Sequence, residues 1–147
     1  MHKLTLLSVG KIKTSWIKDG CEVFTERIGH SCDFSERILT AGEQTDEYMR
    51  LEQALGKVTG TIVLLDELGA EQTSKEFAAF LGKKRDLGEP VTFVIGGAYG
   101  LGDRVRAMGY KTIALSRMTF PHELCKLIFL EQLYRAQSIL EGRGYHH

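Results

Sequence analysis

Five short apolar runs, each separated from the next by a stretch long enough for a helix, limit the folds open to this chain more than any other feature. This alternation is typical of an α/β fold in which helical crossovers join parallel strands. The runs cover residues 3–9, 34–39, 61–65, 91–95 and 112–115. The third and fourth are continuously apolar, as expected for central strands with helices on both faces. We therefore expect a mostly parallel sheet covered on both sides.

Several residues mark where the intervening helices begin. Thr73 and Glu76 have the spacing of a capping box, in which each residue satisfies a free backbone N–H of the first turn. Ser15 is a candidate cap for the first helix, and a second helix is expected over about residues 45–55. The last helix is expected to start near Pro121, a favoured first-turn residue, and to continue to about residue 140.

This last helix is apolar around much of its circumference, more than packing on one face of a sheet requires. Its apolar residues are Leu124, Leu127, Ile128, Phe129, Leu130, Leu133, Tyr134, Ala136, Ile139 and Leu140. It is either a deeply buried core helix or a helix that packs on the sheet with one side and on a second subunit with the other. We favour the homodimer, because a small domain has little interior in which to bury a helix on all sides.

The charge balance weakens any argument for a protein that coats nucleic acid through bulk positive charge. The chain has 147 residues, enough for one domain spanning residues 1–147, with 19 Lys and Arg against 19 Asp and Glu. Residues 96–147, however, hold 7 of the basic residues and only 4 of the acidic ones. The C-terminal third is therefore the electropositive end.

The three cysteines are too few and too scattered for a disulfide framework, and no Cys/His spacing is typical of a metal site. The apolar stretch near the N-terminus is too short for a secretory signal or a membrane span. We expect a cytoplasmic protein with reduced thiols, no membrane association and no metal.

The most informative local feature is a glycine-rich loop, Gly96-Gly97-Ala98-Tyr99-Gly100-Leu101-Gly102, directly after the fourth apolar run. Its spacing is not the Gly-x-Gly-x-x-Gly of a dinucleotide site, and it does not follow the first strand. No Gly-Lys-Ser/Thr closes it as in a phosphate-binding Walker loop. Either glycine serves here only to form a tight turn, or the backbone must closely approach a ligand.

The segment Leu115-Ser116-Arg117-Met118-Thr119-Phe120-Pro121-His122 leaves the next strand at the same end of the sheet. Ligands of open parallel sheets bind beyond the carboxyl ends of the strands. Two such loops, one glycine-rich and one mixed apolar and hydroxylic, would offer backbone polar groups to the edge of a purine and apolar walls to its faces. This combination favours a ligand site over a simple turn.

These two loops, together with Glu131-Gln132-Leu133-Tyr134-Arg135-Ala136 and the terminal Tyr145-His146, resemble the ribosomal RNA large subunit methyltransferase H family. This is a SPOUT-class family of small S-adenosylmethionine-dependent enzymes. The resemblance spans essentially the whole chain and is weaker in the N-terminal half, where it rests on the opening Lys-Leu-x-Leu-x-x-Val-Gly-Lys, on Thr40-Ala41-Gly42 and on Leu65 with Gly69. It implies a C-terminal trefoil knot, a homodimer, and methylation of N3 of a pseudouridine in the 23S ribosomal RNA of assembled ribosomes.

Carried over residue by residue, the resemblance places S-adenosyl-L-methionine contacts at Leu65, at Gly96 and along one continuous run. The run comprises Leu115, Ser116, Arg117, Met118, Thr119 and Phe120. Because the methyl-bearing sulfur is positively charged, the loops around it can be nearly neutral. Arg117, the one ionised side chain of the run, could point towards RNA instead.

The candidates for the catalytic, substrate-facing side are Arg135, His146, Tyr145 and His122. Arg135 could anchor a phosphate or stabilise a uracil oxyanion, Tyr145 could stack on the base, and His146 could accept the N3 proton. Each of these residues also has a purely structural interpretation, which for Tyr145 and His146 is a frayed chain end. Arg135 could simply pair with Glu131 one helical turn away, and His122 could satisfy the start of a helix.

Other functions stay open at this point. A SPOUT enzyme acting on another RNA nucleoside would have the same cofactor loops, and a non-catalytic ribosome- or RNA-binding module could keep the fold without turnover. A small-molecule-binding domain of the flavodoxin type is disfavoured, because the turn after the first strand, residues 9–14, has a single glycine.

The tail after the last helix differs from the family in one respect. The family usually places a basic residue after Tyr-His, whereas this chain has His147. The connection at residues 42–46 is also short for the family.

Overall fold

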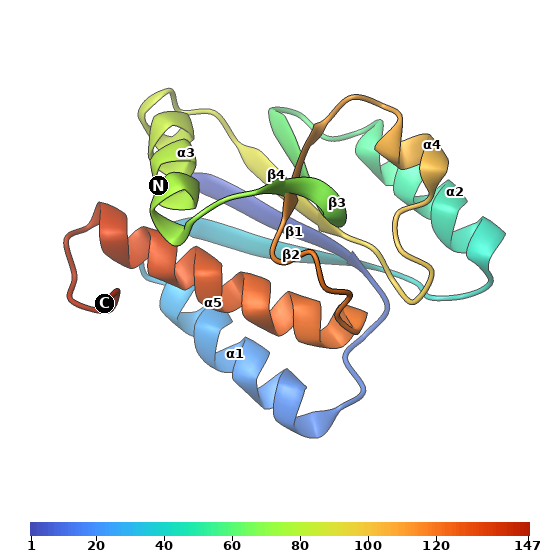
Figure 1. The fold of residues 1–147 in the computed structure, drawn as a ribbon, viewed down its shortest axis with the longest axis horizontal. Coiled ribbons are helices and arrows are strands. Elements are labelled where there is room, and N and C mark those ends of the chain that lie inside the picture. Colours follow the sequence, from blue (N-terminus) through green and yellow to red (C-terminus); the bar gives the residue numbers. More distant parts are fainter.

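The computed structural model describes residues 1–147 (Figure 1). Its elements in chain order are β1 (Lys3–Val9), α1 (Ser15–Gly29), β2 (Asp33–Leu39), α2 (Gln44–Leu55), β3 (Thr61–Glu71), α3 (Ser74–Asp86), β4 (Val91–Ile95), α4 (Asp103–Arg106), β5 (Lys111–Ala114) and α5 (His122–Leu140). None of the helices is both long and apolar enough to cross a membrane. The expected alternation of strands and helices is confirmed, and most bounds agree within one residue.

The five strands form one sheet in the order β2-β1-β4-β3-β5, and every neighbouring pair is parallel. β3 is longer than expected, because it continues past Leu65 through an irregularity and pairs again with β5 from Ala70 onward. Gly69 lies in this irregular segment, where a Cβ atom would stand 2.8 Å from the backbone of Ile113. The order places β3 between β4 and β5, so the loops that follow these three strands are neighbours.

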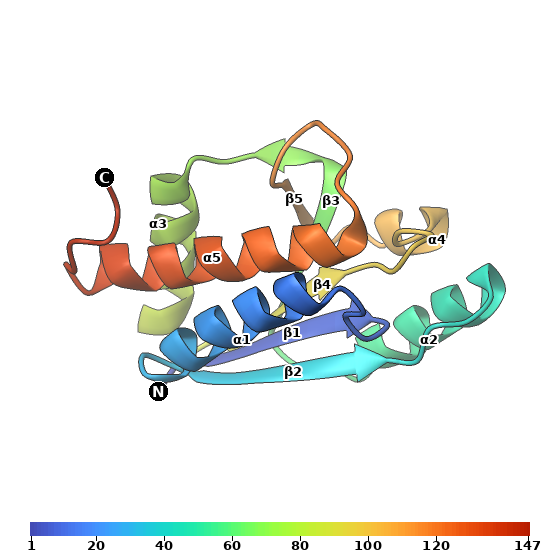
Figure 2. The same cartoon turned by 90° about the horizontal axis from the view of Figure 1, so that it is seen from below.

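Helices cover both faces of the sheet, as predicted (Figure 2). On one face, α1, α3 and α5 pack on Leu4, Val63 and Phe93, and the rings of Phe93 and Phe129 lie 4.8 Å apart between their centroids. On the other face, α2 and α4 pack on side chains such as Leu64 and Val94. The continuous apolar runs in β3 and β4 thus supply both cores. The α/β class is confirmed, and the trefoil knot stays a prediction.

The capping box at the start of α3 is confirmed, since Thr73 Oγ1 accepts from the N–H of Glu76 at 3.1 Å and Glu76 accepts from the N–H of Thr73 at 3.0 Å. The cap predicted at Ser15 is wrong. Thr14 precedes α1 without a side-chain cap, and the carboxylate of Glu123 in α5 accepts from the backbone N–H groups of Lys13 and Thr14 instead. These hydrogen bonds, the Lys13 N–H foremost, lower the pKa of Glu123.

The long helix α5 packs against both α1 and α3, so much of its apolar circumference is covered within the chain. It begins at His122, and Pro121 occupies the capping position just before it rather than the first turn. No side chain of α5 is exposed, which agrees in part with the core-helix alternative. The homodimer stays a prediction, and its support has to come from elsewhere on the surface.

Candidate active site

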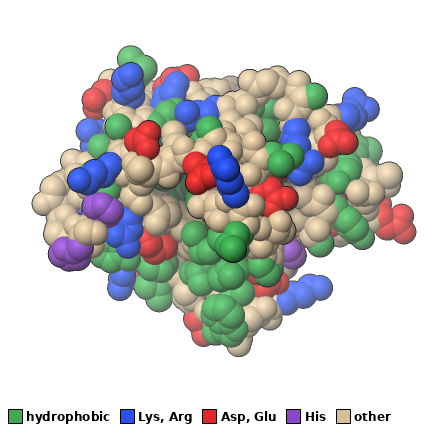
Figure 3. Space-filling model, in the orientation of Figure 1, with side chains coloured by type: hydrophobic (Ala, Val, Ile, Leu, Met, Phe, Trp, Pro, Cys, Tyr) green, Lys and Arg blue, Asp and Glu red, His purple; other side chains and the backbone are tan.

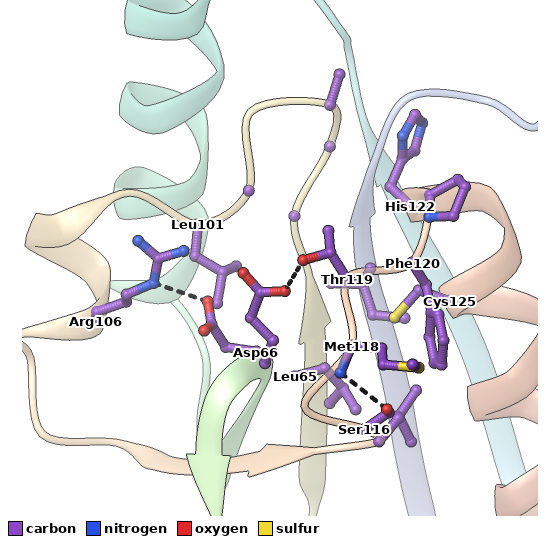
Figure 4. Close-up of a pocket in the computed structure, with 18 residues that line it drawn as sticks. Leu65, Asp66, Leu101, Arg106, Ser116, Met118, Thr119, Phe120, His122 and Cys125 are labelled. Carbon is purple, nitrogen blue, oxygen red and sulfur yellow. Dashed lines mark hydrogen bonds and ion pairs between the residues drawn. The ribbon is translucent and has the colours of Figure 1, made fainter.

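A cavity of about 580 Å³ opens at the carboxyl ends of β3, β4 and β5 (Figure 4). Its wall is formed by the three loops that follow these strands, by Arg106 of α4 and by the start of α5. The predicted cofactor residues that line it are Leu65, Gly96, Leu115, Ser116, Met118, Thr119 and Phe120. Segments as much as 55 positions apart in the chain are therefore brought together around one space, at the sheet edge where the sequence places a ligand site.

The glycine loop forms one wall of the cavity, and glycine is required there by close backbone contact. A Cβ atom at Gly96 would lie 2.4 Å from the carbonyl carbon of Gly100, and one at Gly97 would lie 2.6 Å from Oε1 of Glu47. The tight turn is confirmed, and the approach of the loop backbone to a ligand stays a prediction. The turn folds back on itself between Gly97 and Gly100, and this brings the loop backbone to the cavity.

A second wall is polar and was not foreseen from the sequence. Asp66, which directly follows the buried part of β3, is almost fully buried; its Oδ2 accepts from Nε of Arg106 at 2.8 Å and its Oδ1 from the N–H of Leu68 at 2.9 Å. The hydrogen bond that Arg106 donates to Asp66 is the main cause that raises the pKa of Arg106. The signal in the sequence is an ionisable pair of residues, Asp66-Glu67, directly after a continuously apolar strand.

The loop between β5 and α5 closes the third side. Ser116 Oγ accepts from the N–H of Met118 at 3.0 Å, and Thr119 donates its hydroxyl hydrogen to Glu67 across the cavity mouth. Arg117 does not line the cavity: its side chain is exposed and forms an ion pair with Glu71. Its assignment as a cofactor contact through the side chain gains no support from this placement.

The first residues of α5 complete the wall with His122 and Cys125. Burial raises the pKa of the Cys125 thiol to about 11, so the thiol is neutral at physiological pH. His122 is thus the one predicted substrate-side residue that borders the cavity. The charged side chains lining the cavity are Asp66, Glu67 and Arg106, which together carry one net negative charge.

The other three predicted substrate-side residues meet in a separate group, here called the C-terminal cluster: Arg135, Tyr145, His146 and the adjoining Tyr134. The Arg135 guanidinium lies 4.9 Å from the centroid of the Tyr145 ring, which packs edge-on against Tyr134 at 4.7 Å. Nε of Arg135 donates to Glu131 at 2.8 Å, and this hydrogen bond raises the pKa of Arg135. The structural and the functional interpretation of Arg135 are therefore compatible.

The contact between Arg135 and His146 fixes the tautomer of the imidazole. Nη1 of Arg135 and Nδ1 of His146 are 3.0 Å apart. A guanidinium has only donors, so Nδ1 must be the acceptor, and a neutral His146 carries its hydrogen on Nε2. The free edge of the ring is therefore a hydrogen-bond donor, and His146 could accept a proton only after Arg135 releases Nδ1.

Two further arginines border the C-terminal cluster and were missed in the sequence. The guanidiniums of Arg27 and Arg143 lie 5.6 and 5.3 Å from the centroid of the Tyr134 ring. Figure 3 shows basic and histidine side chains gathered at the end of the molecule where the chain ends. Arg27 belongs to α1, so only the packing of α1 against α5 reveals its place.

The cavity and the C-terminal cluster lie at opposite ends of α5 (Figure 1). Thirteen residues separate His122 from Arg135, which at about 1.5 Å per helical residue is roughly 20 Å. Within one chain, a group held in the cavity is thus far from Arg135 and His146. The structure brings the predicted residues together in two places rather than one.

Comparisons with known proteins identify the family of the chain. The model of a family described as predicted SPOUT methyltransferase matches residues 2–146. A protein of Geobacter metallireducens named ribosomal RNA large subunit methyltransferase H is 44% identical over 99% of both chains. Proteins of the same name from Geotalea daltonii and Nitratidesulfovibrio vulgaris are 42% and 40% identical, also over 99% or more of each chain. The chain therefore belongs to the SPOUT methyltransferase family.

Proposed function

We propose that this methyltransferase takes its methyl group from S-adenosyl-L-methionine and places it on N3 of a pseudouridine in the 23S RNA of the assembled ribosome. The observation that carries the proposal is the cavity, because seven of the eight predicted cofactor residues line it together. The relatives named for ribosomal RNA methylation support the class of substrate. We infer that the protein works in the cytoplasm, where ribosomes are found.

The cavity fits the proposed methyl donor in size, shape and charge. Its volume lies within the range of about 300–1,000 Å³ that is usual for ligand sites. Leu65, Leu115 and Phe120 provide apolar walls, and the backbone of the glycine loop provides polar groups. The net negative charge from Asp66, Glu67 and Arg106 complements a ligand that carries a sulfonium and an ammonium group.

Once bound, S-adenosylmethionine supplies a methyl group activated by a sulfonium. The chain's residues then have to orient the donor, exclude bulk water and stabilise the uracil anion that forms when N3 passes its proton to solvent before the methyl group is transferred. The apolar walls and the Asp66–Arg106 pair hold the donor side rigid. On the substrate side, Arg135 and the Nε2–H of His146 donate towards the uracil oxygens on which negative charge develops. Tyr145 offers a face for the base.

We infer that two copies of the chain share each active site, because the cavity and the C-terminal cluster are roughly 20 Å apart in one chain. An antiparallel dimer would bring the cluster of one copy to the cavity of the other. Figure 3 shows apolar side chains gathered on the face that carries α1 and α5, and α1 exposes Trp16 and Val23 there. This apolar surface supports a homodimer. The composition of α5 no longer does so, because α1 and α3 cover much of that helix within the chain.

Mass-spectrometric mapping of labelled methyl groups tests the reaction. Ribosomes from a strain lacking this protein are incubated with labelled S-adenosylmethionine, with and without the protein. We expect one methyl group on N3 of a large-subunit pseudouridine. Label on another nucleoside would show that the protein is a methyltransferase with a different substrate. No label, together with no binding of S-adenosylmethionine by calorimetry, would favour the non-catalytic module.

Mixing two impaired variants tests the shared site, in an assay at a concentration of S-adenosylmethionine too low for either variant to be active alone. Gly96→Ala damages the cavity, and Arg135→Ala damages the C-terminal cluster. After the two are unfolded and refolded together, half of the dimers are mixed, and one of their two sites combines an intact cavity with an intact cluster. We expect about a quarter of the parental activity. If each site belongs to one chain, the mixture stays inactive.

A further inference from the structure

One half of a sheet face has no helix over it. On the side of α2, the outward side chains of β1 are Lys3, Thr5, Leu7 and Val9, and α2 and α4 cover only the last two. In Figure 2, α2 lies towards the carboxyl ends of β1 and β2, and no helix covers their amino-terminal halves on this face, whereas α1 runs along them on the other. Parallel sheets are normally covered on both faces by apolar contacts. The polar, uncovered half is therefore unusual for this fold.

A hollow of about 200 Å³ lies on this uncovered surface, here called the sheet-face groove. It is lined by Lys3, Thr5, Leu7, Arg37, Val58, Thr59, Pro90 and Thr92. Two cationic side chains and three hydroxyl groups thus surround one space, and no aromatic side chain borders it. Nothing in the proposed reaction uses these residues.

Charge in the sheet-face groove is uncompensated by ion pairs. Neither Lys3 nor Arg37 lies within ion-pair distance of a carboxylate, whereas most arginines on the rest of the surface do; these are Arg85, Arg104, Arg106, Arg117, Arg135 and Arg143. Among the outward side chains of β1, β2 and β4 on this face, the one acid is Asp33, opposite Lys3 in the register and also unpaired. Both cations are thus available to a ligand.

We propose that the sheet-face groove binds a phosphodiester of the RNA backbone, at a place separate from the cavity and the C-terminal cluster. A guanidinium, an ammonium and hydroxyl groups are the donors that proteins use for nucleic-acid phosphates. Protein interfaces are commonly anchored by Trp or Tyr side chains, and the absence of any aromatic residue from the groove favours RNA over a protein partner. The inference rests on the proposed function in one respect, that RNA is the substrate.

The test replaces both cations, Lys3→Gln with Arg37→Gln, and measures binding to large ribosomal subunits and to protein-free 23S RNA over a range of salt. Both side chains are exposed, so the fold is expected to persist, which thermal unfolding checks. The matched control is Lys75→Gln with Lys83→Gln, two exposed lysines of α3 without ion pairs, which changes the net charge equally. A second control, Lys3→Arg with Arg37→Lys, keeps the charge.

We expect the double Gln variant to bind both RNA targets roughly 5- to 30-fold more weakly, and the dependence of log K on log salt to fall by about 0.7 per lost contact. The Michaelis constant for ribosomes rises, while the turnover number and the affinity for S-adenosylmethionine stay at the parental values. Asp33→Asn should tighten binding. The charge-conserving variant should bind like the parent.

Three results would overturn the inference: equal losses in the α3 control, an unchanged salt dependence, or weakened binding to ribosomal subunits with normal binding to protein-free RNA. The last result would assign the groove to a ribosomal protein. Failure of the proposed function would be seen separately, as an absence of methylation by the parent protein. The binding measurements that test the groove do not depend on turnover.

Discussion

Replacing Gly96 by alanine adds one methyl group and should weaken ligand binding in the cavity. The new Cβ atom would lie 2.4 Å from the carbonyl carbon of Gly100, against 3.4 Å for ordinary van der Waals contact, so the loop has to move by 3.4 − 2.4 = 1.0 Å. Both partners are backbone, and no side chain can rotate away. Over-packing of this kind costs about 1–3 kcal/mol.

Two measurements follow from that displacement. At about 1.4 kcal/mol per tenfold change, calorimetry should show S-adenosylmethionine binding weakened by roughly 5- to 140-fold. Thermal unfolding should begin lower, with a midpoint depressed by about 3–9 °C for a chain of this size. The two losses have the same origin and should appear together.

Gly29→Ala is the matched control, because it adds the same methyl group where nothing lies within 4 Å and the backbone is not left-handed. It should leave binding and the unfolding midpoint at the parental values. The reasoning is refuted if Gly96→Ala binds S-adenosylmethionine within about twofold of the parent and unfolds at the same temperature. In that case the contact between Gly96 and Gly100 does not shape the cavity.

Three further predictions concern stability and reactivity. Thr73→Ala removes half of the capping box and should lower the free energy of unfolding by about 1 kcal/mol, measured by urea denaturation, whereas Thr73→Ser should restore most of it. The pKa of Glu123 is lowered in the folded state, so its contribution to stability is complete above the ordinary carboxyl pKa of about 4.5 and is lost as pH falls through the folded-state pKa. Glu123→Gln should therefore make the unfolding midpoint depend less on pH across that acid range. An unchanged dependence of the midpoint on pH would contradict this. Burial raises the thiol pKa of Cys21 and Cys125 to about 11 and that of Cys32 to about 12, so at pH 8 about one thiol in a thousand or fewer is ionised. Mass spectrometry should find little alkylation by iodoacetamide in the folded protein and full alkylation in urea.

The fold was predictable where local patterns are strong. Continuous apolar runs indicated the central strands correctly, because a buried parallel strand needs apolar side chains on both faces. The contact that holds the start of α1 was not predictable, since the N–H groups of Lys13 and Thr14, just before the helix, donate to Glu123, more than 100 positions away. Strand order was equally hidden, because alternation of elements does not determine which strand lies between β4 and β5.

The candidate site was predictable to the level of its loops and not beyond. The glycine loop and the segment after β5 stand out because their residue types suit backbone contact and apolar walls. Asp66 and Arg106 do not, since their pairing joins β3 and α4 at positions 40 residues apart. The sequence names Arg135 and His146 as substrate-side candidates without indicating their distance from the cavity, which becomes apparent only when α5 is placed between the two groups.

Every residue that lines the cavity lies between positions 65 and 125. The first 60 or so residues therefore act as a support that does not line the cavity proposed to bind the methyl donor. Changes in length or charge among β1, β2 and their connections can accumulate there without altering donor affinity. A lineage can in this way adjust how the protein docks on its target while the chemistry is inherited unchanged.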